Sequence, residues 1–277
     1  MKTRLITAGI AASLFLIILF IPGSFALTLL NSFICAVALI EVLTVTKVVQ
    51  HRGLEAAAIA FASIAPFFSR FNGGVVFIIC LLYVLALVLL TLRYHEVITI
   101  DKVGMVFLLS VLVAVSLSCL SYLRVSGRQD SDGLFYVLLA LLMAWMADSG
   151  AYFVGTFFGK HKLCPRISPK KTVEGLIGGI VCSLLFSVLA GWIYESAILK
   201  GTASVSYGEI FVLALICAPL SVVGDLFASV LKRRCGVKDF GKFFPGHGGM
   251  MDRFDSLLFV LPTVFLTVRQ FPLIYSI

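Results

Sequence analysis

The chain has 277 residues, of which 60% are hydrophobic and 13% are charged. Soluble domains carry about 25% charged residues, so this composition excludes an ordinary soluble protein and predicts a polytopic membrane protein. The formal net charge is +8, but the basic residues lie in short segments between apolar stretches. This placement favours anionic lipids or nucleotides as partners and argues against nucleic acid.

Apolar stretches that approach or reach the roughly 20 residues of a membrane span recur along the chain. We predict an all-α fold of about nine transmembrane helices, at residues 5–21, 25–46, 55–69, 74–92, 104–123, 133–158, 173–194, 207–231 and 256–270. The third stretch is short, so we expect it to be tilted, half-buried or re-entrant. Because the sequence shows no internal repeat, residues 1–277 are predicted to form a single membrane domain.

The distribution of lysine and arginine predicts the orientation of these helices. With a cytoplasmic N-terminus, seventeen of the 22 basic residues face the cytoplasm. The five on the other side are Arg70, Arg124, Arg128, Lys200 and Arg269. Cytoplasmic loops carry an excess of positive charge, so this is the expected topology. It turns the two charge-dense loops, 159–172 and 232–255, toward the cytoplasm, where nucleoside triphosphates are found.

The most informative segment runs from Ser229 to Asp255 and reads SVLKRRCGVKDFGKFFPGHGGMMDRFD. It concentrates cations, separated carboxylates and glycines between two strongly apolar stretches, a combination suited to a metal-bound polyphosphate. Each feature alone has an ordinary explanation, since a KRR cluster at a helix end is usually a topology anchor and a lone His247 is usually a loop histidine. Their occurrence together favours a functional site.

The carboxylates near this segment suggest a metal centre. Asp225, Ser229 and Lys232 are spaced i, i+4, i+7 and would share one helix face, and Asp252 and Asp255 would share a face where the last span begins. A carboxylate in or near hydrocarbon is usually paired, metal-bound or turned toward a wet cavity. We therefore predict a divalent cation between Asp225 and Asp252, and Mg²⁺ fits this donor set best.

The second charged loop carries Lys170 and Lys171 just before a predicted helix. Ser168 or Thr172 is expected to cap that helix, with Pro169 fixing its first turn. This arrangement would place both lysines and the positive helix terminus toward an anion. A plain basic loop on the cytoplasmic side explains the same residues equally well when the loop is considered alone.

Two acidic residues lie inside predicted spans. Asp148 is well within the stretch 133–158, where an unpaired carboxylate would be costly, so we assign it to the polar cavity. Glu41 is similarly placed in the stretch 25–46, and there a structural polar contact is the favoured interpretation.

The charged segment follows the pattern S-x-[apolar]-K-R-x4-K-D-x-[small]-x2-[apolar]-[PG]-x-H-G-G-[apolar]-x-D-R-[apolar]-D at every fixed position, beginning at Ser229 and ending at Asp255. This pattern resembles the signature of the phosphatidate cytidylyltransferase, or CDP-diacylglycerol synthase, family. The segment 148–175, which includes SPKKTVEG, is similar to the second characteristic region of that family. The first 130 residues resemble it only loosely.

The resemblance implies an enzyme that joins CTP to phosphatidic acid, giving CDP-diacylglycerol and pyrophosphate. It implies that Asp225 and Asp252 hold Mg²⁺, with K⁺ as a candidate second ion, and it suggests a homodimer. The chain looks bacterial in its organisation, so the expected location is the plasma membrane, with the active site facing the cytoplasm.

The resemblance also assigns roles to residues. The lipid phosphate is already an anionic nucleophile, so no strong base is required, and the obstacle is its repulsion by the triphosphate. The catalytic candidates are Asp225, Asp252, Lys232, His247 and Arg253. The substrate-binding candidates are Asp148, Ser168, Lys170, Lys171, Glu174, Ser229, Arg233, Lys238, Asp239, Gly248, Gly249 and Asp255. Because all of these lie within 131–277, we expect residues 1–130 to act as a scaffold or dimerisation region.

Two other functions fit part of this pattern. A related CTP-dependent enzyme acting on an ether lipid or a polyprenol would need the same loops, because these loops do not encode the lipid tail. A cation-coupled transporter would use Asp148, Asp225 and Asp252 as intramembrane sites, but transporters usually show internal repeats and polar residues at the midplane. Here the polar residues gather at one membrane face, which favours the enzyme.

Overall fold

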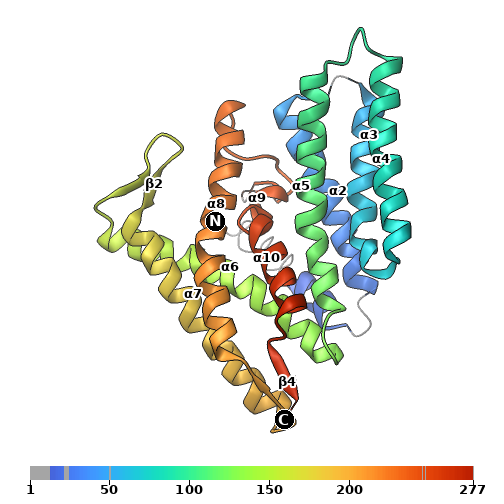
Figure 1. Ribbon diagram of the computed structural model, residues 1–277. Helices are drawn as coiled ribbons and strands as arrows, with labels where there is room; N and C mark the ends of the chain where they lie inside the picture. Colours follow the sequence, from blue (N-terminus) through green and yellow to red (C-terminus); the bar gives the residue numbers. More distant parts are fainter. Residues whose placement is uncertain (1–12, 22–24, 50, 245, 247, 277) are drawn as a thin grey trace. The chain divides into compact units, whose positions relative to one another are not determined.

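The computed structural model describes residues 13–21, 25–49, 51–244, 246 and 248–276, and it is built mainly of helices (Figure 1). The chain forms two compact units. Unit 1 consists of Met1–Tyr122 and Leu231–Phe254, and unit 2 consists of Leu123–Val230 and Asp255–Ile277. The motif-bearing segment 231–254 therefore folds with the N-terminal helices.

Unit 1 is a bundle of helices that lie side by side (Figure 1). After a helical stretch at 13–20, the chain forms α2 (Phe25–Thr46), α3 (Arg52–Ile64), the 3₁₀ helix η1 (Ala65–Arg70), α4 (Gly73–Arg93) and α5 (Ile100–Arg124), and α9 (Met251–Phe254) follows in the returning segment. Polar side chains join these helices. The Asn31 amide of α2 donates to the Leu117 carbonyl of α5 at 2.8 Å, and the Tyr83 and Ser110 hydroxyls of α4 and α5 lie 2.5 Å apart. Such hydrogen bonds hold apolar helices together where hydrophobic burial contributes little.

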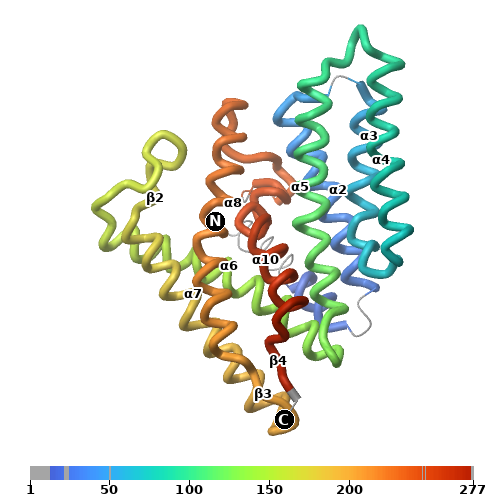
Figure 2. Tube along the Cα trace, in the orientation of Figure 1, coloured from blue at the N-terminus to red at the C-terminus, as the bar shows by residue number. Residues whose placement is uncertain are grey.

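Unit 2 combines long helices with two small sheets, and its chain path can be followed in Figure 2. Its elements are α6 (Asp130–Phe158), β1 (Lys162–Cys164), β2 (Ser168–Thr172), α7 (Val173–Tyr194), the π-helical turn η2 (Glu195–Leu199), β3 (Ala203–Val205), α8 (Tyr207–Arg234), α10 (Leu257–Gln270) and β4 (Ile274–Ser276). Strands β1 and β2 form an antiparallel hairpin, and β3 pairs with β4 in antiparallel register. The last four residues of α8 belong to unit 1.

The sequence prediction of an apolar helical fold is confirmed for most of the chain. Six described helices are long and apolar enough to cross a membrane, namely α2, α4, α5, α6, α7 with η2, and α8. Helices α3 and α10 have 13 and 14 residues and are shorter than a full span. The predicted span 5–21 lies mostly outside the described residues, so the count of nine stays a prediction. The purely helical description is corrected by the two sheets, because part of the loop 159–172 forms the β1–β2 hairpin.

Close packing of α6 on α7 depends on small residues, and it predicts a stability effect. A Cβ atom added at Gly178 of α7 would overlap the side chain of Val154 of α6, whereas one added at Gly208 of α8 would meet open space. We expect Gly178→Ala to lower the free energy of unfolding by about 1–3 kcal/mol, the usual cost of overpacking. Thermal unfolding in detergent should show a lower midpoint for Gly178→Ala and an unchanged one for the matched control Gly208→Ala. Equal midpoints would contradict this account of the packing.

Candidate active site

Unit 2 gathers polar side chains from α6, α8 and the β1–β2 hairpin into one group, which we call the α8 cluster. Its members are Asp148, Lys171, Ser221, Asp225 and Ser229. The Lys171 ammonium lies 2.6 Å from Oδ2 of Asp225, and the Ser229 hydroxyl donates to Oδ1 of the same carboxylate at 3.3 Å. The Ser221 hydroxyl donates to Oδ1 of Asp148 at 3.1 Å. Both carboxylates are therefore partnered, as expected of acidic side chains near hydrocarbon.

Local sequence explains how the α8 cluster is presented. Ser221, Asp225 and Ser229 are four residues apart, so they lie on one face of α8. Lys171 is the residue before Thr172, which is the N-cap of α7 and accepts a hydrogen bond from the Gly175 amide at 3.1 Å. Of the two caps predicted for this helix, Thr172 is confirmed and Ser168 is wrong, because Ser168 begins β2.

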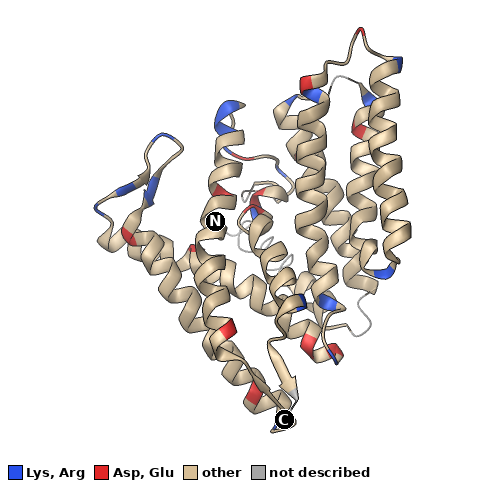
Figure 3. Ribbon diagram, in the orientation of Figure 1, with Lys and Arg blue, Asp and Glu red and all other residues tan. Residues whose placement is uncertain are grey.

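The base of the β1–β2 hairpin is fastened to α7 through Glu174. Its carboxylate accepts hydrogen bonds from the backbone amides of Lys160 at 3.0 Å and His161 at 3.2 Å. The His161 ring lies 2.6 Å from the same carboxylate. The hairpin itself bears exposed cations, among them Lys162 and Lys170 (Figure 3). It therefore presents positive charge on a backbone that is anchored at the start of a helix.

In unit 1, the residues after α8 fold around the carboxylate of Asp252. Oδ1 of Asp252 lies 2.7 Å from the Lys232 ammonium, and Oδ2 accepts from the backbone amides of Phe240 at 2.8 Å and Gly249 at 2.9 Å. The side chains of Lys232 and Asp252 are only 12% and 4% exposed. We call Lys232, Phe240, Gly249 and Asp252 the loop cluster. This carboxylate therefore holds the Lys232 ammonium in a defined direction.

The remaining predicted residues lie in the sequence between Arg233 and Arg253. Gly248 adopts a φ of +88° beside the Asp252 carboxylate, a conformation that favours glycine. Arg233, Lys238, Asp239 and Arg253 are exposed, and His247 falls outside the described residues.

The expected shared helical face of Asp252 and Asp255 is wrong. Helix α9 ends at Phe254 and α10 begins at Leu257, so Asp255 lies in the turn between them. There its side chain accepts from the Ser256 amide at 2.9 Å. The structure thus brings Asp225 to Lys171 in unit 2 and Asp252 to Lys232 in unit 1. The prediction that one metal joins Asp225 and Asp252 stays a prediction.

The donor chemistry of unit 2 fits a hard cation such as Mg²⁺. Asp148 and Asp225 are close enough to interact electrostatically, and the Asp225 side chain is 33% exposed. These two neighbouring carboxylates attract positive charge. The Lys171 ammonium supplies one positive charge, so the pair can attract a further cation. Within the described residues, no three His, Cys, Asp or Glu side chains form a metal-binding group. Mg²⁺ does not require one, because it commonly takes one or two carboxylates and completes its shell with water and phosphate oxygens.

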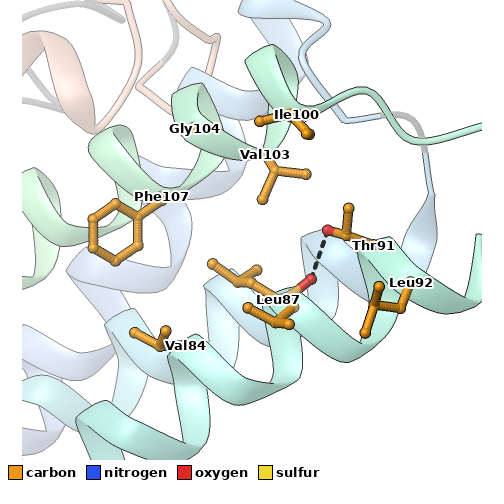
Figure 4. Close-up of a pocket in the computed structure, with 9 residues that line it drawn as sticks. Val84, Leu87, Thr91, Leu92, Ile100, Val103, Gly104 and Phe107 are labelled. Atoms are coloured by element: carbon orange, nitrogen blue, oxygen red, sulfur yellow. Dashed lines mark hydrogen bonds between the residues drawn. The ribbon is translucent and has the colours of Figure 1, made fainter. Parts of the chain in front are cut away.

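An apolar groove between α4 and α5 of unit 1 has a volume of about 430 Å³ (Figure 4). Its lining includes Leu87, Val103 and Phe107, and the hydroxyl of Thr91 is already donated to the Leu87 carbonyl at 2.7 Å. A nucleotide needs charged or hydrogen-bonding partners, which this lining does not offer. The groove suits hydrocarbon, so the chemistry belongs to the polar clusters.

Comparison with known proteins identifies the family of this chain. Residues 2–271 match the cytidylyltransferase family. The chain belongs to this family. The phosphatidate cytidylyltransferase of Bacillus subtilis is 36% identical over 276 residues, which cover 98% of both chains. Those of Staphylococcus haemolyticus and Staphylococcus aureus are 35% and 34% identical over 98% of this chain and 100% of each relative. This cytidylyltransferase is therefore similar to its relatives from end to end, and it is a nucleotidyltransferase.

Sequence reasoning missed three contributors to the site of this cytidylyltransferase. Ser221 stands four residues before Asp225, so the helical spacing that found Ser229 could have found it. Ser256, which also hydrogen-bonds Asp148, has no local signal because its partner lies in α6. The Phe240 amide contributes through the backbone, which residue patterns do not reveal. Glu41 makes the polar contact that was expected of it, by accepting from the Met251 amide at 3.0 Å.

Proposed function

We propose that this cytidylyltransferase joins CTP to phosphatidic acid within a membrane, giving CDP-diacylglycerol and pyrophosphate. The observation that carries the proposal is the similarity along the whole chain to enzymes named phosphatidate cytidylyltransferase. The two clusters of carboxylate-held lysines and the cationic hairpin add the chemistry that such a reaction needs. CTP and phosphatidic acid are accordingly the substrates, and phospholipid synthesis is the process served.

The reaction forms a bond between a phosphate oxygen of the lipid and the α-phosphorus of CTP, and it breaks the bond between that phosphorus and the oxygen bridging to the β-phosphate. Pyrophosphate leaves with the bonding electrons. The incoming phosphate is already an anion, so the main task of the protein is to offset repulsion between anions. Lys171 and Lys232 are directed by Asp225 and Asp252, while Lys170 and Arg233 are exposed and available to phosphates.

We propose Mg²⁺ as the cofactor, with K⁺ as a candidate second ion. The carboxylates that would hold Mg²⁺ are Asp225 and Asp252, and Asp225 is supported by its exposure and by its neighbour Asp148. When bound, the metal supplies positive charge to the triphosphate and its leaving group. The protein's own residues orient the substrates and direct the lysines.

Removal of the metal is expected to stop the reaction. Purified protein in detergent is supplied with radiolabelled CTP, phosphatidic acid and Mg²⁺, with or without EDTA. We expect labelled lipid and released pyrophosphate to fall by about a hundredfold or more in EDTA, as for other metal-assisted phosphate chemistry. Excess Mg²⁺ should restore both, and EDTA already saturated with Mg²⁺ is the control.

The outcomes of this assay separate the parts of the proposal. Undiminished labelling of lipid in EDTA would overturn the proposed Mg²⁺ requirement and leave the proposed reaction supported. Labelling of an ether lipid or a polyprenyl phosphate, without labelling of phosphatidic acid, would reassign the acceptor. Absence of labelled lipid with every acceptor would return weight to a transporter.

We also propose the topology, location and assembly. The N-terminus and both charged loops face the cytoplasm, about nine segments cross or enter the inner membrane of a bacterial cell, and the protein forms a homodimer. The excess of basic residues on one side supports the topology. Within unit 1, Glu41 near the end of α2 contacts Met251 of the charged segment, as expected if both are at the same membrane face.

A further inference from the structure

Glu41 links the second helix of the chain to the charged segment 210 positions later. Its Oε2 accepts from the Met251 amide at 3.0 Å, and the Met250 amide also hydrogen-bonds the carboxylate. Met251 begins α9, so this amide is one of those that an α-helix leaves without a partner in its first turn. Glu41 therefore binds the backbone immediately before Asp252.

Two glycines let the segment approach Glu41. A Cβ atom at Gly241 or at Gly249 would overlap the Glu41 carboxylate. The Gly249 amide also donates to Oδ2 of Asp252 at 2.9 Å. The same backbone turn thus contacts Glu41 on one side and Asp252 on the other.

Little regular structure holds this segment otherwise. Between the end of α8 at Arg234 and the start of α9 at Met251, its described residues form no helix and a single isolated bridge, from Phe244 to Gly248. A stretch without regular structure keeps its shape through specific anchors such as buried polar contacts. The carboxylates of Glu41 and Asp252 both accept hydrogen bonds from backbone amides of this segment.

We propose that Glu41 is a positioning residue for the reaction. From α2, its carboxylate holds the turn at 249–251 so that Asp252 keeps Lys232 directed, and it acts without touching a substrate. The inference rests on the proposed function, because it assigns Glu41 to the segment that would handle the phosphates. Residues 1–130 would then contribute directly to the geometry of the active site.

The test compares Glu41→Ala and Glu41→Gln with Glu55→Ala, a matched change of a glutamate on α3 of the same unit. Glu41→Ala removes both acceptor oxygens. Loss of an ångström in positioning can cost about a hundredfold in rate, so we expect kcat to fall by about that factor with KM for CTP little changed. Glu41→Gln keeps one carbonyl acceptor and should recover to within about tenfold of the native kcat. Glu55→Ala should match the native enzyme.

A second readout does not depend on activity. Lys238 and Lys242 are exposed in the segment. The rate at which trypsin cleaves after them therefore reports how firmly the segment is fixed in place. We expect faster cleavage there in Glu41→Ala than in the native protein, and intermediate cleavage in Glu41→Gln. Native kcat together with native cleavage in Glu41→Ala would overturn the inference. Faster cleavage would still support the anchor if phosphatidic acid proved to be the wrong acceptor.

A substitution in the charged segment can disturb the same contact while Glu41 stays unchanged. Gly241→Ala places a methyl group where the Glu41 carboxylate lies. If Glu41→Ala does not fold, Gly241→Ala should reproduce the faster cleavage and the reduced kcat. Native behaviour of Gly241→Ala in both measurements would overturn the inference.

Discussion

Asp252→Asn is expected to abolish turnover. In the native protein one carboxylate oxygen faces the Lys232 ammonium and the other receives two backbone amides. A carboxamide has one acceptor oxygen, so in either orientation its NH₂ group must face a donor. The Lys232 ammonium also loses this carboxylate in a nearly buried position, and breaking a buried ion pair typically costs about 3–5 kcal/mol. We expect kcat to fall by about a thousandfold or more, because stabilisation of the reacting phosphates depends on directed charges.

The measurement is transfer of label from CTP to lipid by purified variants, with helix content and thermal midpoint recorded on the same samples. Asp101→Asn is the matched control, because Asp101 is an exposed carboxylate in the first turn of α5 in the same unit. Turnover within tenfold of native in a folded Asp252→Asn protein would show that this carboxylate does not organise the site.

Asp225→Asn is the second change with a large expected effect. In the native protein the Asp225 carboxylate pairs with Lys171 and is one-third exposed, so we expect the substitution to cause little loss of stability. The loss should appear in turnover instead, by about a hundredfold to a thousandfold, and the concentration of Mg²⁺ needed for half-maximal rate should rise. Glu209→Gln is the control on the same helix, where Glu209 accepts from the Tyr275 hydroxyl at 2.7 Å.

A double-mutant cycle separates two roles of Asp225. If Asp225 only directs Lys171, then Asp225→Asn should have no further effect in a Lys171→Met background. If it also holds the metal, Asp225→Asn should still reduce turnover and still raise the Mg²⁺ requirement in that background. An unchanged Mg²⁺ requirement in both backgrounds would contradict the metal assignment.

The helices of this protein could be predicted from its sequence because their cause is local. Apolar runs such as those that form α4 and α5 are long enough to cross hydrocarbon, and their boundaries fall at Asn72, Arg93 and Arg124, where the sequence becomes polar. The same holds for α8, where a spacing of four placed Asp225 and Ser229 on one face. The family likewise followed from a continuous motif.

The sequence alone thus determined the apolar helices, the charged segments and the chemistry they suggest, since composition and periodicity act over a few turns of chain. Which residues meet depends instead on the packing of the helices. Ser221 reaches Asp148 across 73 positions and Met251 reaches Glu41 across 210, and both contacts depend on how helices pack. The hairpin within the loop 159–172 and the turn between Phe254 and Leu257 were also missed, because local propensity does not encode strand pairing or side-chain anchors.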